Sequence, residues 1–338
     1  MHGGQRRERI LASPNARDGR FVNLNGVELD GASFSPGIAS DFLFGGGRRV
    51  PSRPLPVHDP RERWTRAPGS ELRITWLGHS SLLLELGDMR ILTDPVLGSR
   101  ASPLSFAGPR RFHRAPVEVA ELPPIDLVLL SHNHYDHLCR STMRALAQRD
   151  VAVVTALGVG AHLEAFGFDV RRIHELDWFE HVELRGARFT ALPAQHFSGR
   201  GLLDRNATLW ASFAIDSGAQ RLFFSGDTGF FPELEALGER YGPFDITMLE
   251  IGAFHPAWGA VHLGPQNATR AHQLLRGRKL LPIHWSTFDL ALHPWHEPAE
   301  TLFGLASDAG VDLILPELGL AIEPARDEPA RPWWRRLV

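Results

Sequence analysis

The sequence predicts an α/β protein of mixed, α+β character, in which β-sheets pack face to face and helices cover their outer surfaces. Short apolar runs separated by turn residues come first along the chain, and helical segments alternate with further strands after them. The 338 residues suffice for one large or two ordinary domains. No repeat with a period of about 20 to 50 residues is visible, which argues against a solenoid.

The first half of the folded body is expected to be rich in strands. Apolar runs bounded by Gly, Pro, Asn or Asp are typical of buried strands, and short turns between them favour antiparallel pairing. Arg185–Gly186 is expected near the turn of a hairpin. The expected elements are strands at 72–79, 81–86, 89–95, 125–131 and 151–156, helices at 141–149 and 158–166, and the hairpin at 181–196.

The second half alternates strands with helices. Apolar residues recur at helical spacing in three segments, and each of these follows or precedes a short apolar run. The expected elements are strands at 208–216, 221–227, 244–253, 279–284 and 311–316, and helices at 232–240, 264–277 and 298–310.

Both ends of the chain differ from this body. Residues 1–70 are rich in Gly, Pro and Arg, so we expect an irregular N-terminal extension packed on a folded body at 71–325. Residues 326–338 form a basic and aromatic tail in which Trp333 and Trp334 adjoin arginines. Such a tail is either a strap packed on the body or a peripheral membrane contact.

Composition excludes several classes of protein. The formal net charge of −3 gives no electrostatic case for binding nucleic acid. The single cysteine, Cys139, excludes an internal disulfide and fits a reducing compartment. No signal peptide and no apolar run of roughly 20 residues is visible, so we expect a cytoplasmic protein, peripheral at most to a membrane.

The segment "SHNHYDH", residues 131–137, gathers three histidines and an aspartate directly after a buried apolar run. In an extended segment, residues two apart point the same way, so His132 and His134 can bind one ion. Asp136 and His137 lie on the continuing turn, where they can bind a second ion. Because this spacing is specific, it favours metal binding over a structural role for these residues.

Three more chelating side chains end short apolar strands. His196 ends "FTALPAQH", Asp227 ends "RLFFSGD" and His284 ends "KLLPIH". Together with 131–137, they indicate a rim where the carboxyl ends of four strands converge. Imidazole with carboxylate suits zinc, with iron or manganese as alternatives, and a carboxylate such as Asp227 can bridge two cations.

In this order, these residues resemble the metal site of the metallo-β-lactamase superfamily, whose fold is a four-layer αββα sandwich. The motifs "WLGHSSLLLE", "ILTDPVLGSRASP", "GPRRFHRAP", "ELPPIDLVLLSHNHYDHL", "ELDWFE", "FSGDTGF" and "IHWSTFDLA" together resemble the N-acylphosphatidylethanolamine-hydrolysing phospholipase D group. The resemblance runs from about residue 72 to about residue 297. It implies two zinc ions per chain, the first held by His132, His134 and His196, the second by Asp136, His137 and His284, with Asp227 bridging them.

The resemblance also indicates residues around the metals. Asp136 is expected to orient the attacking water, and Asp94 in "TDP" and His79 in "LGH" to hold metal-ligand histidines. For His79 and Asp94, local turn hydrogen bonds are the alternative. His262 in "VHLGPQ" is expected to stabilise the phosphate or protonate the leaving oxygen, with a surface-loop histidine as the alternative.

Some positions depart from the group's pattern. Phe254 and His255 stand where tyrosine and an acidic residue are expected, and Gly264 replaces an aspartate. We expect Phe254 and Trp258 to border a lipid substrate, and Trp285 to pack in the core.

The leading functional interpretation is a zinc-dependent phospholipase D that cleaves the phosphate–head-group bond of glycerophospholipids. A lactonase or carboxylic-ester hydrolase on the same scaffold is the alternative, and a nuclease or a non-catalytic metal-binding protein is disfavoured. The sequence leaves the lipid and the oligomeric state open, a homodimer included.

Overall fold

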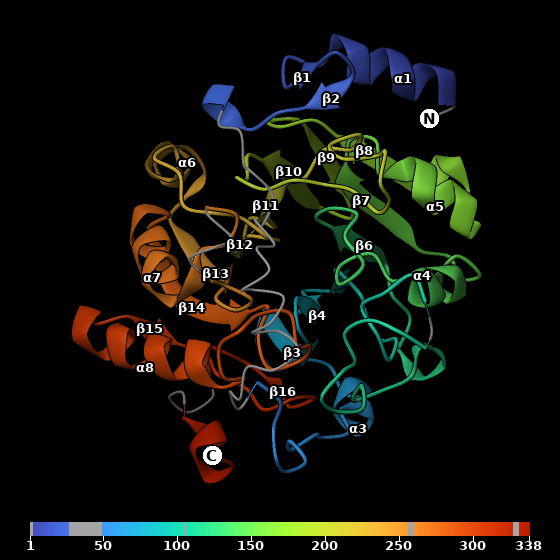
Figure 1. The fold of residues 1–338 in the computed structure, drawn as a ribbon. Coiled ribbons are helices and arrows are strands. Elements are labelled where there is room, and N and C mark those ends of the chain that lie inside the picture. The colour runs from blue at the N-terminus through green and yellow to red at the C-terminus, as the bar shows by residue number, and fades with distance from the viewer. Residues whose placement is uncertain (1–2, 27–48, 105, 256–259, 327–330) are drawn as a thin grey trace.

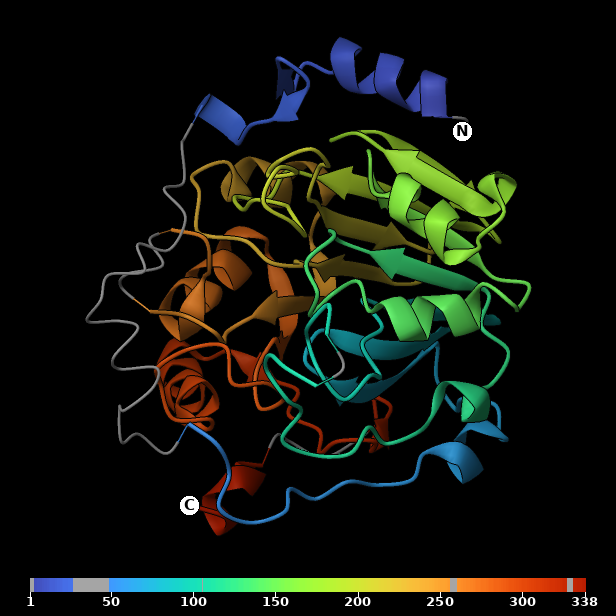
Figure 2. The ribbon, with the colours of Figure 1, turned by 45° about the vertical axis from the view of Figure 1, so that its right-hand side comes forward.

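The computed structural model describes residues 3–26, 49–104, 106–255, 260–326 and 331–338, which form two facing β-sheets with helices on the outside (Figures 1 and 2). Each sheet has seven strands. The helices of the first half cover one sheet and those of the second half cover the other. The predicted four-layer αββα arrangement is therefore confirmed.

The first sheet contains one antiparallel and one parallel half. Its strand order is β16-β3-β4-β5-β6-β7-β8. Pairing is antiparallel from β16 to β5 and parallel from β5 to β8, with Leu92 opposite Val128 in the register. The strands are β3 (Leu72–Gly78), β4 (Ser81–Leu86), β5 (Met89–Thr93), β6 (Leu127–Leu130), β7 (Ala152–Ala156), β8 (Ile173–Leu176) and β16 (Ala321–Ile322).

The second sheet also has one parallel and one antiparallel half. Its order is β15-β14-β13-β12-β11-β10-β9, parallel from β15 to β12 and antiparallel from β12 to β9. The strands are β9 (His181–Leu184), β10 (Ala187–Leu192), β11 (Ser212–Asp216), β12 (Arg221–Phe224), β13 (Phe244–Glu250), β14 (Gly277–Ile283) and β15 (Asp312–Leu313). The expected hairpin turn at Arg185–Gly186 is confirmed, and both residues have positive φ.

Helices cover the outer faces of the sheets, and the central strands of the first sheet are buried on both faces. Every residue of β3, β4 and β6 is buried. In Figure 2 the helices of the first half lie on the opposite side of the molecule from those of the second half. The helices are α4 (Arg140–Leu146) and α5 (Gly160–Phe166) on the first sheet, and α6 (Leu234–Tyr241), α7 (Gly264–Leu274) and α8 (Glu297–Ala309) on the second.

The expectation of irregular structure is wrong for part of the N-terminal region. Residues Gly3–Ala12 form helix α1, although their sequence has little apolar periodicity. Distant contacts stabilise this helix, because the buried Arg6 pairs with Glu164 and, at 2.8 Å, with Glu175. The other unexpected elements are the short strands β1 (Ala16–Arg17), β2 (Arg20–Phe21), β8 and β16, helix α3 (Arg61–Trp64) and the 3-10 turns Leu24–Gly26, Val119–Glu121, Val170–Arg172 and Trp333–Arg336.

The C-terminal tail packs on the body as a strap. Trp333 and Trp334 are buried, and Trp334 Nε1 donates a hydrogen bond of 2.7 Å to Glu300 Oε2 on α8. The membrane-contact alternative therefore does not hold for these two indole rings. Trp285 lies in the same aromatic cluster, with ring centroids 5.6 Å from Trp333 and 5.4 Å from Trp334, as expected for a core residue.

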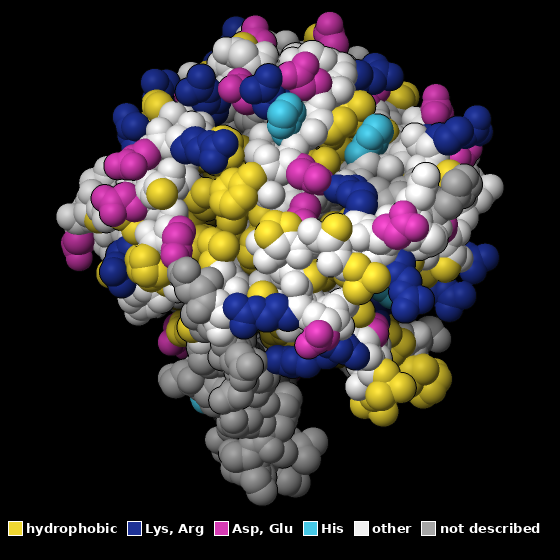
Figure 3. Space-filling model, turned by 90° about the horizontal axis from the view of Figure 1, so that it is seen from above, with side chains coloured by type: hydrophobic (Ala, Val, Ile, Leu, Met, Phe, Trp, Pro, Cys, Tyr) yellow, Lys and Arg dark blue, Asp and Glu magenta, His cyan; other side chains and the backbone are white. Residues whose placement is uncertain are grey.

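The surface gives no sign of a membrane-spanning element in the described residues. None of the helices there is long and apolar enough to cross a bilayer. On the face seen from above, basic and acidic side chains are interspersed (Figure 3).

Candidate metal centre

The predicted chelating side chains meet at one edge of the sandwich. His132, His134, Asp136 and His137 follow β6, while His196, Asp227 and His284 follow β10, β12 and β14. The first set comes from one sheet and the second from the other. Parallel strands carry their carboxyl ends to the same edge, so a polar residue after each strand reaches the same space.

One set of side chains, which we call the first group, consists of His132, His134 and His196. His132 Nε2 lies 2.9 Å from His134 Nδ1, and His196 Nε2 lies 3.2 Å from the same atom. Asp227 Oδ2 lies 3.9 Å from His132 Nε2 and 3.7 Å from His196 Nε2. Three imidazole nitrogens and one carboxylate oxygen therefore surround a space of the size that one cation needs.

The second group consists of Asp136, His137 and His284. Asp136 Oδ2 lies 3.6 Å from His137 Nε2 and 3.4 Å from His284 Nε2. Asp227 also reaches this group, because its Oδ2 lies 3.1 Å from His137 Nε2 and its Oδ1 lies 3.2 Å from His284 Nε2. Asp227 thus contacts both groups.

Unsatisfied polar atoms show that these residues fit a bound metal. His137 Nε2, His284 Nε2 and Asp227 Oδ1 are all buried and have no hydrogen-bond partner. Buried polar atoms are usually hydrogen-bonded, since an unpaired one costs about 1–3 kcal/mol. Imidazole nitrogens and carboxylate oxygens that converge without partners form a donor set suited to cations.

Electrostatics supports the same interpretation for the first group. Burial lowers the pKa of His132 and of His196 well below the ordinary value, and lowers the pKa of His134 to about 4. These rings are therefore neutral at neutral pH, which leaves the nitrogen lone pairs that a metal ligand requires.

The second group is more strongly charged. Burial alone lowers the pKa of His137 and of His284, but the nearby carboxylates, chiefly Asp227, outweigh it and raise both values. The same carboxylates that stabilise protonated His137 and His284 would stabilise a metal cation, so a cation would replace the protons on these two rings.

Asp94 holds one of these histidines from behind. Its Oδ2 lies 2.6 Å from His137 Nδ1 and accepts a hydrogen bond of 2.6 Å from Ser131 Oγ, while Oδ1 accepts one of 2.7 Å from Ser131 N. A proton fixed on Nδ1 leaves Nε2 of His137 free to face the cluster.

His79 contacts an aspartate of the cluster and not a histidine nitrogen. Its Nε2 lies 3.1 Å from Asp136 Oδ2, and its ring lies over that of His284 at 3.9 Å between centroids. The expectation that it holds a ligand histidine is therefore corrected to a contact with Asp136. His79, Asp94 and His284 all have positive φ, a backbone strain that is common at functional sites.

His262 faces both groups. Its ring centroid lies 5.4 Å from that of His196 and 5.3 Å from that of His284. Only 11% of its side chain is exposed, so the surface-loop alternative is wrong. It follows β13 and directly precedes α7, as the sequence predicts.

Glu250 is a site residue that the sequence did not reveal. It is fully buried at the end of β13, and its Oε1 lies 3.2 Å from His262 Nδ1 and accepts a hydrogen bond of 2.6 Å from Leu263 N. The signal was a glutamate within the otherwise apolar run "ITMLEIGA".

Two of the residues that depart from the expected pattern, Phe254 and Gly264, lie against each other. Gly264 has a φ of +62°, and a Cβ at this position would stand 3.2 Å from the Phe254 ring. A side chain at 264 would adopt a strained positive φ and would need the Phe254 ring to move by a few tenths of an ångström, so the glycine suits the phenylalanine beside it. Trp258, the other expected substrate neighbour, lies outside the described residues.

The fold and the buried imidazole–carboxylate cluster define a metal-dependent hydrolase. Residues 89–285 match the family model of the β-lactamase superfamily domain. The chain belongs to the metallo-β-lactamase superfamily.

Known proteins agree with this assignment. The chain is 41% identical over 330 residues to an uncharacterised protein of Mycobacterium tuberculosis, with 96% of this chain and 88% of that one covered. It is 36% identical over 279 residues to N-acyl-phosphatidylethanolamine-hydrolyzing phospholipase D 1 of Caenorhabditis elegans, covering 79% of this chain and 78% of that one. The structure of an isothiocyanate hydrolase from Delia radicum gut bacteria shares the fold, with a TM-score of 0.59, 20% identity and coverage of 74% and 98%.

Proposed function

We propose that this protein is a phospholipase D-type phosphodiesterase that cleaves the phosphate–head-group bond of glycerophospholipids such as N-acylphosphatidylethanolamine. The observation that carries the proposal is the contact of Asp227 with both groups of chelating side chains, which suits a pair of cations and an anionic tetrahedral substrate. The C. elegans relative, a phospholipase D by name, supports the choice of substrate.

The proposed cofactor is a pair of zinc ions, the first held by His132, His134 and His196 and the second by Asp136, His137 and His284, with Asp227 between them. Zinc bound there would lower the pKa of water toward neutrality and offset the charge of the phosphate oxygens. Iron or manganese would suit the same imidazole and carboxylate donors.

The chain's own residues orient the reaction. The Asp136 carboxylate, held by His79 at 3.1 Å, is positioned to accept a hydrogen bond from the attacking water and direct it at phosphorus. On the other side of the cluster, His262 is the proposed acid that protonates the leaving oxygen. Glu250, 3.2 Å from His262 Nδ1, would accept a hydrogen bond from Nδ1–H, which leaves Nε2 as the nitrogen that delivers a proton to the leaving oxygen.

A lactonase or carboxylic-ester hydrolase is the second candidate function. Phe254 and Gly264, which lie against each other and depart from the phospholipase D pattern, motivate it, because Gly264 is two residues after the proposed acid. Both functions use the same cluster and differ in the atom attacked.

The atom attacked distinguishes the two functions. Zinc-reconstituted protein is incubated with vesicles of N-acylphosphatidylethanolamine in oxygen-18 water, and the products are analysed by mass spectrometry. We expect label in phosphatidic acid and none in the released N-acylethanolamine. Label in a freed fatty acid would replace the proposal with ester hydrolysis. The Asp227→Asn protein serves as the control for contaminating lipases.

The proposed location follows from the substrate. A phospholipid is met at a bilayer surface, so we propose a cytoplasmic enzyme that contacts membranes peripherally. Flotation of the protein with phospholipid vesicles, compared with its behaviour without them, tests this contact.

A further inference from the structure

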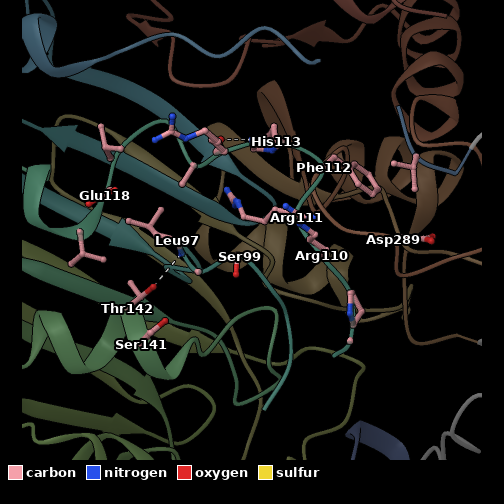
Figure 4. A pocket seen from close by; sticks show the side chains of 18 of the residues that line it. Leu97, Ser99, Arg110, Arg111, Phe112, His113, Glu118, Ser141, Thr142 and Asp289 are labelled. Atoms are coloured by element: carbon pink, nitrogen blue, oxygen red, sulfur yellow. Dashed lines mark hydrogen bonds between the residues drawn. The ribbon is translucent and has the colours of Figure 1, made fainter. Parts of the chain in front are cut away.

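Figure 4 shows a pocket of about 1190 Å³ that contains none of the chelating side chains. Much of its lining comes from the segment "GPRRFHRAP", residues 108–116, which the proposed reaction does not use. The Phe288 ring separates the two sites, with its centroid 5.3 Å from that of His79 and 5.5 Å from the guanidinium carbon of Arg111. The pocket is therefore a neighbour of the metal centre and not part of it.

Arg111 is a buried cation in this pocket with only neutral partners. It is 7% exposed, and its Nη2 and Nη1 donate to the carbonyl oxygens of Leu77 at 2.7 Å and Val96 at 3.3 Å. Its Nε is buried and has no hydrogen-bond partner. Within the described ranges, no carboxylate lies at ion-pair distance from Arg111. Burial lowers its pKa to about 10, so the guanidinium keeps its charge at neutral pH.

The remaining lining leaves an excess of positive charge. The lining contains four arginines and two carboxylates, so two positive charges are not offset. The arginines are Arg49, Arg110, Arg111 and Arg114, and the carboxylates are Glu118 and Asp289. Asp289 lies 3.7 Å from Arg49. Arg110 and Arg114 are exposed, and in the part of the chain that the structure describes neither forms an ion pair. Buried charge without a counter-ion is costly, which makes an anion a favourable occupant.

His113 adds an acceptor to these donors. Its Nδ1 lies 2.7 Å from the carbonyl oxygen of Arg114, which can only accept, so Nδ1 carries the proton and Nε2 does not (Figure 4). Nε2 is buried without a partner. Burial, aided by the charge of Arg111, lowers the pKa of His113 to about 3, so the ring stays neutral. A ligand that satisfies this nitrogen must bring a hydrogen of its own.

We infer that this pocket binds a phosphate group, either inorganic phosphate or the phosphomonoester head group of a lipid, through the guanidinium groups of Arg110, Arg111 and Arg114. Guanidinium groups match the oxygens of phosphate and form strong, charge-assisted hydrogen bonds with them. A protonated phosphate oxygen can donate to His113 Nε2, whereas sulfate has no such hydrogen. This inference does not depend on the proposed reaction.

The test is equilibrium dialysis of the zinc-loaded protein against radiolabelled inorganic phosphate. The Arg110→Gln/Arg114→Gln protein should bind about one phosphate fewer per chain than the wild type, or bind it at least about tenfold more weakly. Binding at the metal centre is common to both proteins and cancels. The Arg7→Gln/Arg17→Gln protein, which loses the same charge elsewhere on the surface, should bind as the wild type does. Identical binding by the wild type and the Arg110/Arg114 variant would overturn the inference.

Arg111→Lys keeps the charge but loses the planar fork, and should weaken phosphate binding by at least about tenfold if circular dichroism shows it folded. If it does not fold, the Arg110→Gln/Arg114→Gln protein decides alone.

Sulfate should compete at least about tenfold less well than phosphate, because it leaves His113 Nε2 unsatisfied. Equal competition by sulfate and phosphate would remove His113 from the site. Displacement by dihexanoyl phosphatidic acid at lower concentrations than by phosphate identifies a lipid head group, and equal displacement identifies phosphate alone.

Discussion

The two groups of chelating side chains are held in different ways. In the first group, the outer nitrogens of the histidines meet neutral partners: His132 Nδ1 lies 2.9 Å from Ser131 Oγ and His196 Nδ1 lies 3.0 Å from the carbonyl oxygen of Val261. In the second group, His137 meets the buried carboxylate of Asp94. The second position therefore depends, at His137, on a charged residue behind it, and we expect it to be the more sensitive to substitution there.

The largest effect is expected where the two groups share a residue. Asp227→Asn removes a charge that reaches both, and a neutral amide bridges two cations poorly. We expect turnover to fall about 100- to 1000-fold, the range for losing one preorganised electrostatic contact. Elemental analysis should show fewer than two metals per chain, with an unchanged circular dichroism spectrum. Asp216→Asn, at the end of β11 and away from the cluster, is the matched control. Wild-type turnover with both metals bound would contradict the bridging role.

The second prediction concerns His262, which faces both groups of chelating side chains but belongs to neither. His262→Ala should slow hydrolysis of a diester with a poor alcohol leaving group by about 100-fold. An activated nitrophenolate needs little protonation, so its hydrolysis should change far less. Equal losses on the two substrates, measured with both metals bound, would exclude His262 as the acid.

Asp94 tests chiefly the second group, because it contacts His137 directly and reaches His132 of the first group only through Ser131 Oγ. Asp94→Asn leaves a weaker partner for His137 Nδ1, and the affinity of one metal should fall about 10- to 100-fold. The first group should keep its metal at wild-type affinity. Zinc titration with a competing chelator separates the two events. A comparable loss at both positions would mean that the groups are not independent.

The smallest effect on turnover is expected from the strap behind the second group. Trp334 packs against Trp285, the neighbour of His284, and Trp334→Ala would leave a large cavity there. We expect a loss of about 3–5 kcal/mol in the free energy of unfolding. Below the lowered melting temperature, turnover and metal content should stay close to the wild type. Loss of one metal in the folded variant would show that the strap positions His284.

The sequence predicted those features that depend on local pattern. Polar residues at the ends of apolar strands gave the chelating set, and the structure brings all seven together. The features that it did not predict depend on distant partners. Helix α1 is held by the pairing of Arg6 with Glu175, and Glu250 is meaningful only through its contact with His262. Neither contact leaves a periodic signal in the chain. β16 has only two residues, and two of the four residues of β8, His174 and Glu175, are polar, so neither strand forms an apolar run in the sequence.

The distribution of the chelating residues along the chain sets the order of events during synthesis. A ribosome that has released the loop after β6 has delivered only part of the cluster, since His196 and His134 are 62 residues apart and His284 comes still later. The first sheet is itself incomplete until β16, close to the C-terminus, pairs with β3. A nascent chain that has not reached His284 therefore lacks part of the second group, and any metal that it captures is held by an incomplete set of ligands. Because metal affinity depends on the full ligand set, a product truncated before His284 is expected to bind metal weakly.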